Sequence, residues 1–161
     1  MSDAAVRLHD EGMTKIVVGV DGSTVGNVAL RWAYDEAALR SAELHLVHCW
    51  DYPYYGTMDV VGLDDKIRAG AQQGAQALLD ELVRTLTAEH PDGKVVVTGE
   101  IAQGGAGWSL LKQAEGADLL VVGSRGHGGF VGMLLGSVSH TVVTHAHIPV
   151  VVVRAPEEPK G

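Results

Sequence analysis

Short runs of apolar residues alternate along this chain with longer segments in which apolar residues recur every three or four positions. A short continuous apolar run is typical of a buried strand, whereas the recurring spacing is typical of a helix that packs by one face. The five predicted strands span residues 15–20, 43–50, 94–101, 118–122 and 149–154. A helix is expected after each of the first four strands.

The predicted helices are recognised by their capping residues and their apolar faces. Ser23 or Thr24 caps the first helix, and the second begins at Asp64. The third spans residues 108–115, after a turn rich in glycine. The fourth follows Ser137, a good N-cap residue. The apolar positions of this fourth helix are Val138, Val142, Val143 and Ala146.

The alternation of strands and helices predicts an α/β fold of parallel strands joined by right-handed crossovers. The strands are mostly apolar on both faces, as a sheet covered on both sides requires. With 161 residues, the chain is predicted to form a single domain over residues 14–154. Residues 1–13 are expected to be a flexible leader and residues 155–161 a flexible tail. Residues 51–62 hold one proline, two glycines and three tyrosines, which predicts a surface loop.

Composition narrows the classes of function. A formal net charge of −8 argues against a nucleic-acid partner, which needs a basic face. Apolar runs stay well below the roughly 18 residues of a membrane span, so no membrane partner is expected. The chain has a single cysteine, which excludes an intrachain disulfide and favours a cytoplasmic location.

The eight histidines do not predict a metal site made by the protein alone. His45 and His48 lie three residues apart on a strand and therefore point to opposite faces. His140, His145 and His147 lack cysteine or carboxylate partners at a spacing typical of zinc sites.

The most informative stretch runs from Gly123 to Ser139. Six glycines lie between the end of the fourth strand and the start of the fourth helix, more than a turn needs. Glycine lets backbone N–H groups approach a ligand closely, so this stretch predicts an anion cradle at a helix N-terminus. Arg125 and His127 are expected near the phosphates, although an exposed arginine in a loop is often only a solvated charge. The alternative for the whole stretch is a glycine-rich surface loop.

The spacing of this stretch points to a known family. Gly123 and Gly126 lie three residues apart, nine residues separate Gly126 from Gly136, and Ser137 follows. This arrangement resembles the nucleotide motif of the universal stress protein family, in its ATP-binding branch. The first strand, through residues 15–23, resembles the opening of that family as well. The resemblance covers roughly residues 14–154 and implies a Rossmann-like, doubly wound, five-stranded parallel sheet of order 3-2-1-4-5 with helices on both faces.

In that order the sheet reverses between its first and fourth strands, and ligands bind beyond the carboxyl ends of strands at such a point. Asp21 and Gly123 would then border one crevice. Asp21 would accept a hydrogen bond from a ribose hydroxyl or help to hold nucleotide-bound magnesium, unless it only forms a turn with its own following backbone. The resemblance places Gly19, Val20 and Cys49 against the adenine. The expected nucleotide-binding residues are Gly19, Val20, Asp21, Cys49, Gly123, Ser124, Arg125, Gly126, His127, Gly128, Gly129, Gly136, Ser137, Val138 and Ser139.

The resulting hypothesis is an ATP-binding protein, with Mg²⁺, that acts as a nucleotide-dependent sensor or regulator in the stress response. The chain lacks a P-loop lysine motif, a dinucleotide fingerprint and a hydrolase elbow, and no catalytic residue is assigned. A weak ATPase and a sensor of another adenine nucleotide, such as cyclic AMP, remain as alternatives. The four valines within Pro149–Arg154 would form a sheet edge that invites pairing with a second copy, and the resemblance implies a homodimer through this last strand.

Overall fold

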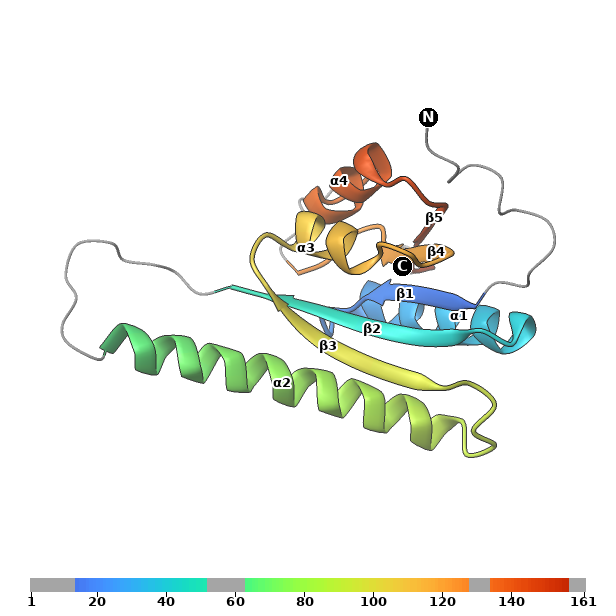
Figure 1. Ribbon diagram of the computed structural model, residues 1–161, viewed down its shortest axis with the longest axis horizontal. Helices are drawn as coiled ribbons and strands as arrows, with labels where there is room; N and C mark the ends of the chain where they lie inside the picture. The colour runs from blue at the N-terminus through green and yellow to red at the C-terminus, as the bar shows by residue number, and fades with distance from the viewer. Residues whose placement is uncertain (1–13, 52–62, 128–133, 157–161) are drawn as a thin grey trace, which may run out of the picture.

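A computed structural model describes residues 14–51, 63–127 and 134–156 of the chain (Figure 1). The predicted leader, the last five residues of the predicted tail and most of the predicted loop at 51–62 lie outside the described residues. The described strands are β1 (Lys15–Gly19), β2 (Glu43–Trp50), β3 (Val97–Gln103), β4 (Leu119–Gly123) and β5 (Val150–Val153). The described helices are α1 (Thr24–Arg40), α2 (Leu63–Glu89), α3 (Ala106–Gln113) and α4 (Ser137–His145).

The five strands form one parallel sheet in the order β3-β2-β1-β4-β5, with β1 at its centre. This confirms the predicted fold class and strand order. Strand β1 pairs with β2 from Lys15↔Glu43 to Gly19↔Val47. Its ladder with β4 is shorter and ends at Val18↔Val121. Beyond that pair the ends of β1 and β4 lie at the point where the sheet reverses its order.

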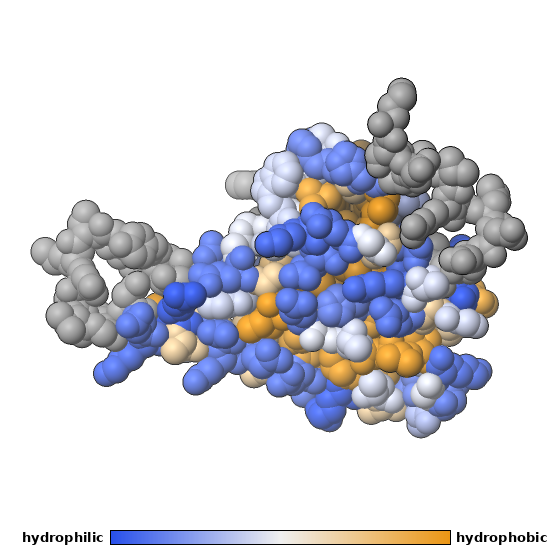
Figure 2. Space-filling view, viewed as in Figure 1, coloured by the Kyte–Doolittle hydropathy of each residue, from blue (hydrophilic) through white to orange (hydrophobic). Residues whose placement is uncertain are grey.

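Helices cover both faces of the sheet (Figure 1). Because successive residues of a strand point to opposite faces, Ile16 and Val18 pack with α1 and α2, whereas Val17 packs with α3 and α4. All three side chains are fully buried. Figure 2 shows hydrophilic side chains over the outer surface of α2 and apolar ones where α2 meets the sheet. The apolar strands predicted from the sequence therefore contribute side chains to two hydrophobic cores, one on each face of the sheet.

The amino end of β1 is fixed by a carboxylate from the start of β4. Asp118 accepts hydrogen bonds from the backbone N–H groups of Thr14 and Lys15, at 2.8 and 2.9 Å, and from the Thr14 hydroxyl at 3.1 Å. Partial burial raises the pKa of Asp118, but the donors of Lys15 and Thr14 together outweigh it, so its pKa lies below the usual value. Folding therefore favours the ionised form of the Asp118 carboxylate.

Some boundaries differ from the sequence prediction. Strand β3 begins three residues later than predicted and ends two residues later, and α3 begins two residues earlier. Ser23 is confirmed as the N-cap of α1, since its side chain accepts from the N–H of Gly26. The predicted N-cap of α4 was wrong by one residue: Gly136 is the cap, because its carbonyl already accepts from the N–H of His140. Val143 is exposed, since Val142 takes the buried position.

Strand β5 lies at one edge of the sheet and is paired only with β4 among the described strands. All four of its valines are half-buried. Val151 and Val153 face the core under α1, and Val150 and Val152 face the core under α4. Among the described residues, no helix is both long and apolar enough to cross a membrane.

Candidate functional site

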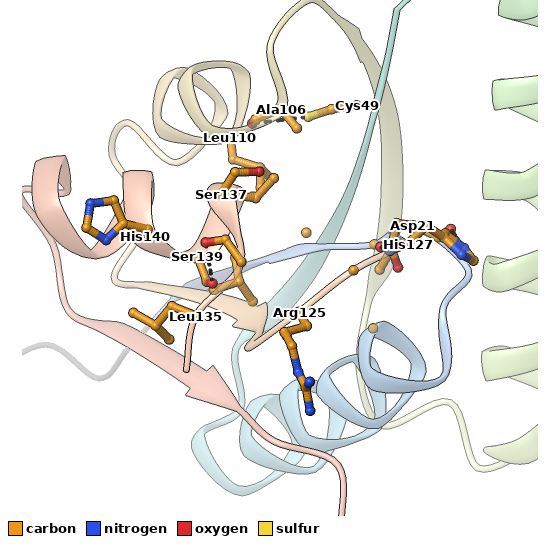
Figure 3. Close-up of a pocket in the computed structure, with 18 of the residues that line it drawn as sticks. Asp21, Cys49, Ala106, Leu110, Arg125, His127, Leu135, Ser137, Ser139 and His140 are labelled. Carbon is orange, nitrogen blue, oxygen red and sulfur yellow. Dashed lines mark hydrogen bonds between the residues drawn. The ribbon is translucent and has the colours of Figure 1, made fainter. Parts of the chain in front are cut away.

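A cavity of about 660 Å³ opens beyond the carboxyl ends of β1 and β4 (Figure 3). The ends of β1, β2 and β4 form its floor, and the starts of α3 and α4 form one wall. The glycine loop, defined as residues 123–136, borders it through its described parts, residues 123–127 and 134–136. This is the crevice at the reversal point of the sheet, where parallel α/β proteins bind ligands.

Close contacts at two glycines shape the wall formed by α3. A Cβ atom on Gly19 would lie 2.7 Å from Cδ1 of Leu110, so the absence of a side chain lets α3 pack onto the end of β1. A Cβ on Gly107 would lie 2.7 Å from two carbon atoms of Thr141, so α3 and α4 also pack closely. The two contacts bring the N-termini of both helices to the same cavity.

Neither of these helix N-termini has a side-chain cap. Gly105 precedes α3 and Gly136 precedes α4, and neither helix start receives a capping hydrogen bond from a side chain. The first N–H groups of a helix have no partner within it and carry a partial positive charge. The start of α4, with Ser137 and Val138 on the cavity wall, is therefore suited to an anion.

Asp21 places a carboxylate at the end of β1. Its Oδ1 atom accepts from the N–H and the hydroxyl of Ser23, at 2.9 and 2.6 Å, which is the turn predicted as the alternative role. Its Oδ2 atom faces the glycine loop and accepts from the N–H of His127 at 3.3 Å. A Cβ on Gly126 would overlap Oδ2, so the loop reaches Asp21 only because glycine stands there. Both roles foreseen for Asp21 are thus compatible, because they use different oxygens.

The side chains of His127 and Arg125, both predicted near the phosphates, point in different directions. The imidazole of His127 bonds the main-chain oxygen of Asp21, with 3.0 Å between Nε2 and O. Arg125 borders the cavity, but Figure 3 shows its side chain extending away from Ser137 and Leu110. Gly128 and Gly129, also predicted at the phosphates, lie outside the described residues.

Ser124 and Ser139 are the two polar residues buried in the described part of the protein, with exposed fractions of 4% and 1%. The hydroxyl of Ser139 donates within the protein, to the main-chain oxygens of Ser124 at 2.9 Å and Gly136 at 3.1 Å. This hydroxyl is therefore already engaged in joining the two ends of the glycine loop. Ser124 shapes the loop through its backbone, whose N–H donates to Val153 at 2.8 Å.

Cys49 lies on the cavity wall at the end of β2. Its Sγ atom lies 3.6 Å from the main-chain oxygen of Ala106. Burial raises the pKa of the thiol to about 11, so the thiol is protonated at neutral pH. Cys49 is therefore a small, largely apolar side chain on the cavity wall, without the activation that a nucleophilic thiol requires.

The structure brings most of the predicted binding residues to one cavity. Those that line it are Gly19, Val20, Asp21, Cys49, Gly123, Arg125, Gly126, His127, Gly136, Ser137, Val138 and Ser139. The sequence prediction missed Gly26, Val47, Ala106, Leu110, Val122, Leu135 and His140. The signal for Ala106 and Leu110 was the glycine-rich turn at Gly104–Gly107, which opens a helix as the glycine loop does.

Within the described ranges, no group of three or more metal-binding side chains was found. The Nδ1 atom of His45 bonds the hydroxyl of Thr98 at 2.8 Å, whereas Nδ1 of His48 bonds the main-chain oxygen of Val20 at 2.8 Å. Each ring is thus used in a separate contact.

Comparison with known sequences agrees with the motif. A sequence model described as the universal stress protein family matches residues 13–154. A universal stress protein of Mycobacterium tuberculosis is 38% identical over 156 residues, which cover 95% of this chain and 49% of that protein. One of Mycolicibacterium smegmatis is 40% identical over 146 residues, which cover 91% of this chain and 47% of that protein. The chain spans about half the length of these curated relatives.

Solved structures show the same architecture. Universal stress protein UspA from Lactobacillus plantarum superimposes with a TM-score of 0.78 at 24% identity, covering 90% of this chain and 100% of that chain. A universal stress protein solved in complex with cAMP superimposes with a TM-score of 0.64 at 28% identity, covering 89% of this chain and 98% of that chain. The first likeness concerns the fold alone.

Proposed function

Because the chain belongs to the universal stress protein family, we propose that it binds an adenine nucleotide in the crevice between β1 and the glycine loop. We propose ATP with Mg²⁺ as the ligand, and a nucleotide-dependent sensor or regulator of the cytoplasmic stress response as the role. One observation carries the proposal. The spaced glycines Gly126 and Gly136 border a cavity of about 660 Å³ at an uncapped helix start, with Asp21 beside them.

The cavity offers a distinct environment for each part of the nucleotide. The adenine would lie among apolar groups of Gly19, Cys49 and Leu110, at the wall formed by α3. The ribose would lie at Asp21, where Oδ2 retains acceptor capacity beyond its 3.3 Å contact with His127. The phosphates would meet backbone N–H groups of the glycine loop and of the first turn of α4.

Charge supports a role for Mg²⁺ when the ligand is a triphosphate. Residues 123–139 contain one arginine and no lysine, and that arginine extends away from the wall at Ser137. Asp21 adds a negative charge to the same cavity. A divalent cation between Asp21 and the phosphates would offset this excess, and carboxylate together with phosphate oxygens suits Mg²⁺.

The same charge balance favours cyclic AMP as a second candidate. A cyclic phosphate carries a single negative charge and would need no cation in this cavity. A related structure at 28% identity was solved in complex with cAMP.

We do not propose a dedicated catalytic activity. Among the described residues that line the cavity, Asp21 is the only carboxylate, and its Oδ1 is engaged by Ser23.

Thermal unfolding with added ligand tests the proposal. A ligand at a hundred times its dissociation constant adds about 2.7 kcal/mol to the free energy of unfolding. For a domain of this size we expect a rise in Tm of roughly 5–10 °C. ATP, ADP, GTP and cyclic AMP should be compared with and without Mg²⁺, and mass analysis should identify any nucleotide released on denaturing the purified protein. The absence of both a shift and a released nucleotide would contradict nucleotide binding.

We also propose that two copies pair through β5. The strand is an edge in the described sheet, and its valines remain half-buried in the single chain. An apolar edge strand without charged residues among its paired positions is a template for another strand. The unpaired backbone groups of β5 would then be satisfied by the partner.

A further inference from the structure

We propose that His127 is a positioning residue, which holds the glycine loop against the end of β1 and thereby fixes Asp21 for the sugar of a bound nucleotide. This inference rests on the proposed function and deepens it. It also changes the role expected from the sequence, in which the His127 side chain approaches the phosphates.

The contacts of His127 with Asp21 come from both its side chain and its backbone. The ring atom Nε2 lies 3.0 Å from the main-chain oxygen of Asp21, and the backbone N–H donates to Oδ2 at 3.3 Å. Because a carbonyl oxygen only accepts, the hydrogen must be on Nε2. In the neutral ring, Nδ1 then carries the lone pair. The two residues are 106 positions apart in the sequence, so these bonds tie distant segments together.

These contacts occur where the sheet itself no longer joins the two segments. The ladder between β1 and β4 ends at Val18↔Val121, and Asp21 lies three residues further along. On the other side of β1, His48 bonds the preceding carbonyl, that of Val20. The carbonyls of Val20 and Asp21, which follow β1, are therefore each bonded by a histidine. One histidine comes from β2 on one side of β1, and the other comes from the loop after β4 on the other side.

The ring of His127 is engaged by the end of the β1 segment, since its Nε2 atom bonds the main-chain oxygen of Asp21. In Figure 3 Asp21 and His127 lie together, on the side of the cavity away from Ser137 and Leu110. The ring bond brings the loop close enough for its backbone N–H to reach Oδ2. Oδ1 is held by Ser23, so the carboxylate is fixed at both oxygens. A carboxylate held in one orientation binds a hydroxyl without first losing rotational freedom, which favours affinity.

Three variants separate this role from a phosphate contact. His127→Phe keeps a planar aromatic ring, although a larger one, and removes the donor, whereas His127→Gln keeps a neutral N–H donor at a similar distance from Cα. His147→Gln changes an exposed histidine beyond α4 and serves as the control. Affinities for adenosine and for AMP should be measured by calorimetry without divalent cations, so that the two ligands differ only in the phosphate.

Loss of one neutral hydrogen bond corresponds to about a three- to tenfold change in affinity. We expect His127→Phe to weaken adenosine and AMP by the same factor in this range. His127→Gln should stay within about twofold of the wild type, and the control should be unchanged. A loss confined to AMP, with His127→Gln as weak as His127→Phe, would show instead that the ring acts on the phosphate.

A second measurement requires no nucleotide. Trypsin cleaves after arginine, and Arg125 lies in the glycine loop two residues before His127. His127→Phe should speed cleavage at Arg125 in the unliganded protein, and His127→Gln should restore the slow rate. Equal cleavage rates in all variants would overturn the proposal. If the wild type binds neither ligand, the proposed function fails, while the cleavage rates still decide whether His127 holds the loop.

Discussion

The hydroxyl of Ser139, in the first turn of α4, donates to the main-chain oxygen of Ser124, 2.9 Å away at the end of β4. The same oxygen accepts from the N–H of Gly136 at 2.7 Å. Ser139 is almost completely buried, with 1% of its surface exposed. The two ends of the glycine loop are therefore joined beneath the cavity by a polar contact that is shielded from water.

Replacing Ser139 by alanine should lower the free energy of unfolding by about 1 kcal/mol, because Ser124 keeps its bond from Gly136 and loses the other. Affinity for nucleotide should fall as well, since the loop ends are less well fixed. Urea unfolding measures the first effect. Thr144→Ala is the matched control, because that hydroxyl bonds a carbonyl on the exposed side of the same helix. Equal losses in the two variants would argue against a special role for Ser139.

Gly126→Val should abolish tight nucleotide binding without unfolding the protein. A Cβ at this position would overlap Oδ2 of Asp21, so the loop must move away from β1. Losing two backbone hydrogen bonds to a phosphate would weaken binding about a hundredfold or more. Gly70→Val is the control, because no atom beyond the neighbouring backbone of its own helix lies within 4 Å of its added Cβ. A folded Gly126→Val protein that binds ATP as tightly as the wild type would place the phosphates elsewhere.

Cys49 provides a direct probe of the cavity, since it is the single cysteine of the chain. Its pKa of about 11 predicts slow alkylation at neutral pH, with a rate that rises about tenfold per pH unit below that value. A bound adenine should cover the thiol and slow alkylation at fixed pH. Mass spectrometry with and without ATP measures the rate, and Cys49→Ser gives the background. An unchanged rate at saturating ATP would show that the base does not lie against β2.

Asp118 predicts a specific pH dependence of stability. Its pKa in the folded protein is lowered below the usual value of 3.8, so its carboxylate stabilises the fold above about pH 4. This contribution is lost as the pH falls through the folded pKa. Asp118→Asn should therefore be less stable than the wild type at pH 7 by about 1 kcal/mol, and the difference should shrink towards pH 3.

Urea unfolding at both pH values measures that difference. Asp35→Asn is the control, because Asp35 is an exposed residue on α1. A difference for Asp118→Asn that stays constant between pH 7 and pH 3 would contradict the stabilising role of the ionised carboxylate.

The proposed homodimer can be tested at the backbone. The main-chain oxygens of Pro149 and Val153 accept hydrogen bonds from the N–H groups of Leu120 and Ser124. Because the backbone groups of alternate residues in a strand point to opposite sides, the N–H of Val152 points to the open edge of the sheet. Val152→Pro removes that donor and leaves the ladder with β4 intact. We expect a dimer for the wild type and a monomer for Val152→Pro in sedimentation at micromolar concentration. Val152→Ala, which keeps the N–H, should remain dimeric. A monomeric wild type would end the proposal.

The fold and the location of the site could be predicted because their signals are local. Apolar runs and helical spacing gave the strands and helices, and the spacing from Gly123 to Ser137 gave the family and its strand order. That order alone brings Asp21 next to the glycine loop, as the structure confirms.

The remaining details depend on packing between distant segments. Leu110 reaches the cavity because Gly19 leaves room for it, and no spacing within α3 indicates that contact. The ring of His127 bonds the carbonyl of Asp21, just beyond β1, and the Ser139 hydroxyl bonds the carbonyl of Ser124, just beyond β4. A sequence shows that these side chains are polar, but their partners are set by the fold.

The fixing of β1 at both ends has a consequence for how this protein can move. Asp118 bonds the residues at its start, and His127 bonds Asp21, two residues beyond its end, from the loop that leaves β4. The backbone amides between them lie in the fully buried centre of the sheet and should exchange with solvent only when the whole domain unfolds. Motions that change the width of the crevice should therefore leave β1 in place.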